Sequence, residues 1–240
     1  MVRVALVCQL ILHAIKQEEP NWHLISIDEK TGIQALERNY PHQPMQKGQP
    51  RRIEYEYTRH GTTCLMAALD VGKGNVLKHK LNPTRTEEDF LEFVEQTCEQ
   101  LPKGDQIVFL ADQLNTHQSE SLVLWIAEQI NYEGPLGKKG QYGILKNIES
   151  RKAFLERTEH RIRFVFTPKH CSWLNPIENW FSKLQRHVIT YGNFSSVKEL
   201  ENKIENYIEF YNRCLIKPLK WKFKGFIKAQ KLNHFKVSKT

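Results

Sequence analysis

Paired cysteines are missing from this chain of 240 residues. Its five cysteines are an odd number, stand far apart and form no C-x-x-C pair: Cys8, Cys64, Cys98, Cys171 and Cys214. The spacing therefore indicates neither a disulfide framework nor a zinc site. We expect a protein of the reducing cytoplasm.

The sequence also has no apolar run long enough to cross a bilayer. Its apolar opening, V-A-L-V-C-Q-L-I-L-H-A-I at residues 4–15, is interrupted by Gln9 and His13. A signal peptide would have a more basic start and a small-residue cleavage site before K-Q-E-E-P. We expect no membrane partner, and an N-terminal lead segment, residues 1–21, in which a short helix or strand packs on the core.

Acidic residues are outnumbered by basic ones. The 27 Asp and Glu stand against 35 Lys and Arg, which gives a net charge of +8 and an isoelectric point near 9.2. This balance favours a polyanionic partner without naming it. Hydrophobic residues make up 40% of the chain, which is enough for one substantial core.

Short apolar runs alternate with amphipathic stretches along the chain. Five segments have the composition of buried strands: Trp22–Asp28, Cys64–Asp70, Asn75–Lys80, Gln106–Asp112 and Arg161–Thr167. Helical periodicity occupies residues 86–100, 119–130 and 195–212 and the stretch after Pro176, with capping boxes at Thr86/Asp89 and Ser196/Glu199. Residues 39–59 and 132–142 have loop composition. The order predicts an α/β fold with a mixed sheet flanked by helices.

Two aspartates follow apolar strands. Asp28 and Asp112 each stand at the predicted carboxyl end of a strand, where a sheet commonly forms a ligand-binding crevice. Carboxylate oxygens are the ligands that Mg²⁺ and Mn²⁺ prefer. A single aspartate at a strand end is more often a turn or cap residue, and Asp70 in D-V-G-K-G-N has the pattern of an ordinary hairpin turn.

A third acid opens a helix in the stretch C-S-W-L-N-P-I-E-N-W-F-S-K-L-Q, residues 171–185. Asn175 is placed as the N-cap and Pro176 as the first helical residue, so Glu178 stands where a capping glutamate normally lies. At about 100° per residue, Glu178 falls between the apolar stripe of this helix and its polar side. It can therefore face a cleft at the sheet edge, and a capping role does not exclude this.

Three motifs carry a resemblance to a known family: S-I-D-E at Ser26–Glu29, F-L-A-D-Q-L-N-T-H at Phe109–His117, and S-W-L-N-P-I-E-N-W-F-S-K-L at Ser172–Leu184. In their order and flanking residues they resemble the DDE transposases of the mariner-type superfamily, especially its bacterial insertion-sequence branch. The resemblance covers about Trp22 to Phe223 and implies a ribonuclease-H-like catalytic domain over residues 22–215. It also implies that Asp28, Asp112 and Glu178 are catalytic and bind metal.

The resemblance implies a chemistry and a setting. Two Mg²⁺ ions per site, with Mn²⁺ as substitute, would support DNA strand cleavage at element ends and strand transfer into target DNA. The partners would be DNA and a second copy of the chain on that DNA, in the bacterial cytoplasm at the nucleoid. Two alternatives remain: a ribonuclease-H-like nuclease that only hydrolyses DNA, and a catalytically idle DNA-binding scaffold derived from a transposase.

The sequence departs from the family pattern in two ways. The third acid follows the second by 178 − 112 = 66 positions, a longer spacing than is common in the family, and the excess includes G-P-L-G-K-K-G. Family members usually carry helix-turn-helix domains ahead of the catalytic domain. We therefore expect a separate or frameshift-joined helix-turn-helix polypeptide as a further partner.

Other residues are predicted to contact DNA or to support the site. Asn115 and His117 follow Asp112 and resemble a family neighbourhood, which predicts a phosphate contact or a structural hydrogen bond. The residues predicted to bind DNA are basic and lie in loops, on the helix after Pro176 and in a basic aromatic tail, residues 216–240: Arg51, Arg52, Lys138, Lys139, Lys183, Arg186, Lys220, Lys222, Lys224 and Lys228.

Two of these segments have competing interpretations. The tail alternates lysines with aromatic residues, and its aromatics either pack on DNA or anchor on the core and leave the lysines solvated. The stretch Arg51–His60 resembles a projecting segment that joins two subunits in mariner relatives, and a plain β-hairpin is the alternative.

Overall fold

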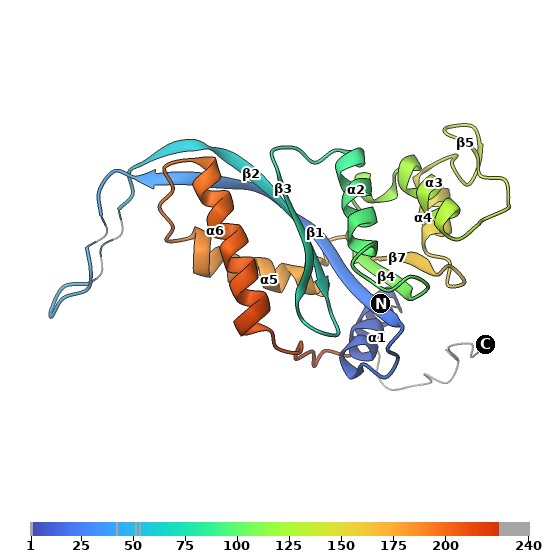
Figure 1. Ribbon diagram of the computed structural model, residues 1–240, viewed down its shortest axis with the longest axis horizontal. Coiled ribbons are helices and arrows are strands. Elements are labelled where there is room, and N and C mark those ends of the chain that lie inside the picture. Colours follow the sequence, from blue (N-terminus) through green and yellow to red (C-terminus); the bar gives the residue numbers. More distant parts are fainter. Residues whose placement is uncertain (1, 42, 51, 53, 226–240) are drawn as a thin grey trace.

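The structure is a computed structural model that describes residues 2–41, 43–50, 52 and 54–225. At its centre is a five-stranded sheet in the order β3-β2-β1-β4-β7 (Figure 1). The strands are β1 (Trp22–Arg38), β2 (Tyr57–Asp70), β3 (Val76–Asn82), β4 (Gln106–Ala111) and β7 (Ile162–Phe166). β1 pairs antiparallel with β2 and parallel with β4, and β4 pairs parallel with β7. The predicted mixed sheet is confirmed.

Six α-helices are present in the described part of the chain: α1 (Val2–Lys16), α2 (Glu87–Cys98), α3 (Glu120–Gln129), α4 (Ile148–Leu155), α5 (Pro176–Leu184) and α6 (Val197–Phe210). Short π-helical segments, Gln185–Ile189 and Tyr211–Leu215, continue α5 and α6. Two 3₁₀ turns, Thr116–Gln118 and Ser172–Leu174, follow β4 and precede α5. β5 (Gly137–Lys138) and β6 (Tyr142–Gly143) form a small hairpin within the predicted loop.

The helices cover both faces of the sheet. Ile25 and Ile27 face a core built with α2, α3 and α4. Leu24, the neighbour of Ile25 in β1, points the other way and packs with α1, since successive strand residues alternate between faces. Further along β1, Ile33 packs with α5 and α6. The apolar opening of the chain is therefore a helix that packs on the sheet.

A register shift lies within β1 between Lys30 and Ile33. Gly32 at this point has a φ of +63°, a backbone conformation that suits glycine. An irregularity of this kind changes which residues face inward. Before it Leu24 and Ser26 face the side of α1 and α5, and after it the odd-numbered Ile33 and Ala35 do so.

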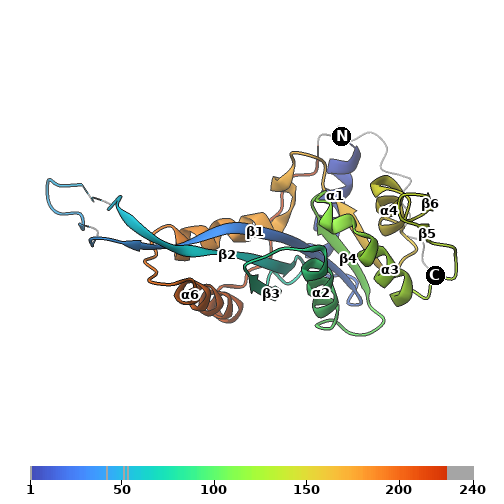
Figure 2. The same cartoon turned by 90° about the horizontal axis from the view of Figure 1, so that it is seen from above.

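The strand carrying Asp28 is longer than the sequence pattern predicts. β1 continues to Arg38 and β2 begins at Tyr57, so the two strands form a long ribbon that runs past α5 and α6, and the segment joining them projects beyond these helices as an arm (Figures 1 and 2). The prediction that Asp28 ends its strand is wrong, because pairing with β2 carries β1 beyond it. The parallel pairing with β4 stops at Ser26 opposite Leu110, so Asp28 still lies where the sheet opens.

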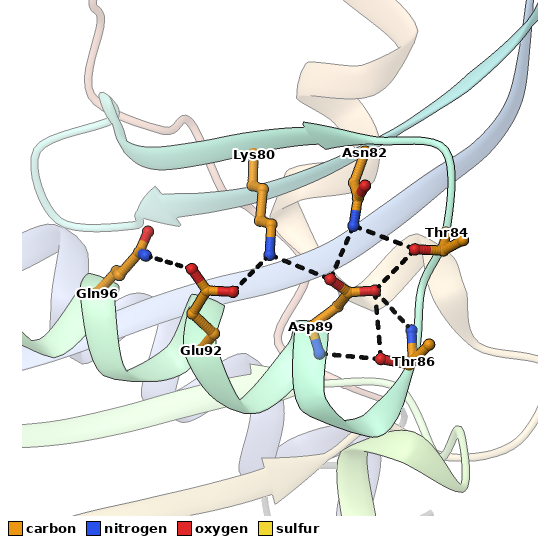
Figure 3. A network of polar contacts seen from close by, with 7 residues as sticks. All are labelled: Lys80, Asn82, Thr84, Thr86, Asp89, Glu92 and Gln96. Carbon is orange, nitrogen blue, oxygen red and sulfur yellow. Dashed lines mark hydrogen bonds and ion pairs between the residues drawn. The ribbon is translucent and has the colours of Figure 1, made fainter.

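The start of α2 is fixed by a polar network around Asp89 (Figure 3). Asp89 accepts hydrogen bonds from the Thr86 backbone and from Lys80 and Asn82 of β3, while Thr86 Oγ1 accepts from the Asp89 backbone at 3.2 Å. The predicted capping box is confirmed, and its acid also links the helix to the sheet edge. At α6, Ser196 Oγ accepts a hydrogen bond from the Glu199 backbone N–H. The Glu199 carboxylate accepts from the backbone N–H of Ser195, so the reciprocal bond is made one residue before the N-cap.

The described part of the predicted tail, residues 216–225, lies in an extended conformation against the core. Leu219, Trp221 and Phe223 pack with the α1 side of the sheet, and Phe223 lies edge-on to Trp173 with ring centroids 5.4 Å apart. Lys220, Lys222 and Lys224 alternate with them and are exposed. The aromatics here are therefore anchored on the core. Across residues 2–225, within the described ranges, no helix has the length and apolarity needed to span a membrane.

Candidate active site

Asp28 and Asp112 lie at the same edge of the sheet. In the parallel ladder Ser26 is opposite Leu110, and continuing this register by two residues brings Asp28 level with Asp112. Asp28 is only 8% exposed. Its burial and the nearby charge of Asp112 together raise the pKa of Asp28 to about 7. The two aspartates therefore form a site of excess negative charge.

The buried imidazole of His117 contacts the carboxylates of Asp112 and Glu29. Its Nδ1 lies 2.8 Å from Asp112 Oδ1, its Nε2 lies 3.0 Å from Glu29 Oε1, and its ring stacks on Phe90. Although burial alone would lower it, these two carboxylates raise the pKa of His117 to about 10. The imidazole is thus a buried cation between two acids, with both ring nitrogens engaged. In turn it lowers the pKa of Asp112, which burial alone would raise.

Asn175 does not cap α5 as predicted. Its side chain turns into the sheet, where Nδ2 donates to Ile27 O and to Asp28 Oδ2, each at 3.1 Å, and Oδ1 accepts from Ser26 Oγ. The cap is supplied across the fold, because Ile177 N donates to Ser26 Oγ at 2.8 Å. The side chain is drawn inward because the buried carbonyl of Ile27 requires a donor. The Ser26–Asn175 pair therefore joins β1 to the start of α5.

Glu178 follows Ile177, the residue whose backbone N–H donates to Ser26. Its backbone N–H donates to Asn175 O, and its carboxylate makes no hydrogen bond within the described residues. Burial raises the pKa of Glu178, with Lys30 acting to lower it and Asp112 to raise it. The capping role is therefore not realised, and the carboxylate lies within electrostatic reach of Asp112.

The donor set suits a hard divalent cation. Asp112, after β4, lies within electrostatic reach of both Asp28 on β1 and Glu178 on α5, and burial together with the charge of Asp112 raises the pKa of Asp28. All of these ligand atoms are oxygens, as Mg²⁺ and Mn²⁺ prefer. Within the described ranges, no three His, Cys, Asp or Glu side chains already form a group that could hold a metal ion.

The remaining predicted residues lie apart from one another. Asn115 is exposed in the turn after Asp112, and its side chain makes no capping bond. Arg52 lies in the arm, whereas Lys138 and Lys139 lie on the β5–β6 hairpin at the opposite end of the molecule (Figures 1 and 2). Lys139 is 3.4 Å from Glu120. The other basic residues lie along α5 and the tail, and Arg51 and Lys228 lie outside the described residues.

Sequence reasoning missed several residues that shape the site. Ser26 and Glu29 lie in the S-I-D-E motif itself, but their partners are about 150 and 90 positions away. Arg151 lies on α4, a helix that was not predicted, and donates to Gln118 O at 2.7 Å beside His117. The one sequence signal that could have identified supporting residues was the position of Ser26 and Glu29 beside Asp28 in the S-I-D-E motif.

The sheet order, the helices on both faces and the acidic edge define a ribonuclease-H-like α/β protein. The model of the DDE superfamily endonuclease family matches residues 23–201, and the chain belongs to this family. No curated protein sequence matches the chain.

Solved structures of the Mos1 transposase share the fold. They include a mariner paired-end complex with Mn, a strand transfer complex and a pre-cleavage transpososome, each with a TM-score of 0.53. Their sequence identities are 16%, 16% and 15%, and the alignments cover 89%, 88% and 88% of this chain. The chain spans 57%, 56% and 57% of their respective lengths. The mariner-type resemblance is confirmed at the level of family and fold, and the bacterial insertion-sequence branch stays a prediction.

Proposed function

We propose that the chain is the catalytic part of a metal-dependent transposase that cleaves DNA at element ends and transfers the freed strand into target DNA. The observation that supports this is the electrostatic proximity of Asp112 to both Asp28 and Glu178 in a DDE-family chain. The solved neighbours are complexes named for paired ends and strand transfer, which favours the same substrates here.

The three carboxylates would hold Mg²⁺ or Mn²⁺, two ions per site. When bound, such ions activate the attacking oxygen and stabilise the leaving 3′-oxygen. The chain itself supplies position: Asn175 and Ser26 fix β1 against α5, and His117 holds Asp112. His117 is already engaged with two carboxylates, so its role is structural and no protein base is needed.

The basic residues would supply DNA affinity at several places. The arm with Arg52, the β5–β6 hairpin with Lys138 and the π-helical segment after α5 with Arg186 lie in different parts of the molecule, where they could contact different stretches of a duplex. Neutralising phosphates with lysine and arginine gives affinity without sequence preference. A second copy of the chain on the same DNA is part of this proposal.

The test uses DNA that carries the inverted repeats flanking the gene. Wild-type protein with Mg²⁺ should nick this duplex at the repeat end, and a pre-cleaved end should become joined to a supercoiled plasmid. Asp112→Asn should abolish both products and keep DNA binding. Nicking without joined product would favour the nuclease that only hydrolyses, and binding without either product would favour the idle scaffold.

A further inference from the structure

A pocket lies on the other side of α5 from Glu178. It has a volume of about 370 Å³ and is lined by α5, the π-helical end of α6, the β2–β3 turn and the segment that follows α6. The polar side chains that line it are Asn179, Lys183, Tyr211, Lys217 and Lys220. At about 100° per residue, Asn179 and Lys183 lie roughly 100° and 140° around α5 from Glu178. The pocket is thus distinct from the acidic edge.

The charge in this pocket is of one sign. Three lysines line it, and no Asp or Glu does. Among the described residues, Lys183, Lys217 and Lys220 form no ion pair with a carboxylate, and Lys183 Nζ lies over the Tyr211 ring, 5.5 Å from its centroid. Burial lowers the pKa of Lys183, and the charges of Arg186 and Lys217 lower it further. The pocket therefore gathers cations that repel one another without a compensating anion.

Hydrogen-bond donors line this pocket together with apolar walls. The lysine ammonium groups and the Asn179 amide can donate to an oxyanion, and Pro176, Pro218 and Leu219 supply apolar surface. Trp180 also lines the pocket and is 1% exposed, with its indole Nε1 buried.

We infer that this pocket binds a phosphate group, and that the group belongs to the backbone of DNA bound by the enzyme. Lys222 and Lys224 support DNA over a free phosphate, because they continue from the pocket along the exposed side of the same extended segment. A polyanionic strand can use that row, whereas a single small anion cannot. The inference rests on the proposed function to the extent that DNA is the substrate.

The experiment compares four variants by fluorescence anisotropy of a labelled DNA duplex over a series of salt concentrations. These are Lys183→Gln, Lys217→Gln, the double variant, and Lys103→Gln as a control that removes an equal charge from an exposed site on the α2–β4 turn. Neutralising one phosphate contributes about 0.9 to the log–log salt slope. Because the two pocket lysines would share one phosphate, the double variant should lose about 0.9 in slope, clearly less than the two separate contacts would give.

The outcomes separate this site from the proposed function. The phosphate site would be overturned if the slope losses of Lys183→Gln and Lys217→Gln add in the double variant, or if the double variant has the same slope as Lys103→Gln. In either case, cleavage by the wild-type protein would still test the proposed function independently. A wild-type protein that binds no DNA would overturn both. Inorganic phosphate is the second probe: if it raises the thermal midpoint of wild type but not of the double variant, while DNA affinity is equal in both, the pocket is a free-phosphate site and the DNA assignment is wrong.

Discussion

Replacing Ser26 with alanine should separate β1 from α5. The Ser26 hydroxyl makes two buried bonds, as donor to Asn175 Oδ1 and as acceptor from Ile177 N at 2.8 Å. Removing it leaves two buried groups without partners, at about 1–3 kcal/mol each, and also removes the only side-chain cap on α5 in the described structure. Since these contributions overlap, we expect a loss of about 2–4 kcal/mol in the free energy of unfolding.

Denaturant unfolding of Ser26→Ala, Asn175→Ala and the double variant measures this loss and its coupling. The two side chains contact each other, so the double variant should be less destabilised than the two single variants combined, by about 0.5–3 kcal/mol. The matched control is Ser182→Ala on the same helix, whose exposed hydroxyl donates to Glu178 O at 3.0 Å. It should change stability by less than about 0.5 kcal/mol.

A stability of Ser26→Ala equal to that of Ser182→Ala would refute the argument. So would simple additivity with Asn175→Ala, because the hydrogen bond between the two side chains would then have no measurable energy. A further readout is cleavage: the variant should cleave DNA more slowly even where it is fully folded, since Asp28 and Glu178 would lose the joint that sets their separation.

Three further predictions concern the acids and His117. Glu178→Gln should keep the thermal midpoint, because the carboxylate makes no capping bond, while Mg²⁺-dependent cleavage collapses and Glu178→Asp retains part of it with Mn²⁺. Cleavage at the wild-type rate by the Gln variant would remove Glu178 from the ligand set. The pKa of Asp89 is lowered to about 2, chiefly by the hydrogen bond from the Thr86 backbone, so its stabilising contribution is present above its unfolded pKa near 3.8 and is lost as pH falls toward 2. Acid unfolding monitored by circular dichroism should therefore show a smaller drop over this pH range in Asp89→Asn than in wild type. His117→Gln should lower stability by roughly 3–5 kcal/mol in urea unfolding, since it removes the buried cation between Glu29 and Asp112, and a loss below about 1 kcal/mol would contradict this.

The sequence predicted the elements of the fold better than their lengths. Apolar runs identify the strand before Asp112 because β4 is buried between two parallel neighbours and ends where burial ends. The apolar run ends too early to predict the full length of β1. Beyond Asp28, buried and more exposed residues are mixed along the strand, and β1 pairs only with β2. Strand length there depends on β2 partners that lie between 57 − 38 = 19 and 66 − 29 = 37 positions away, which no local pattern contains.

The sequence motifs name the acids of the candidate site, whereas they do not name the residues that support these acids. The spacing around Pro176 is that of a capped helix, yet Asn175 turns inward to serve Ile27 and Asp28. Cap and core roles demand the same residue type, so only the three-dimensional fold distinguishes them. His117 likewise needed Glu29 to become a buried cation, and their proximity is a product of packing.

The continuity of β1 has a mechanical consequence. One uninterrupted strand carries Asp28 near its start and leads into the arm at its end, with β2 paired alongside it for most of that length. A paired ribbon of this kind resists bending within its plane, so a displacement of the outer arm is carried back along the backbone toward the acidic edge. Two irregularities in the pairing with β2, between Lys30 and Ile33 and between Gln34 and Leu36, lie between Asp28 and the end of β1 and are the points where this ribbon bends most readily. A force on the arm would therefore be transmitted along β1 to Asp28, one of the carboxylates that bind metal in the proposed mechanism.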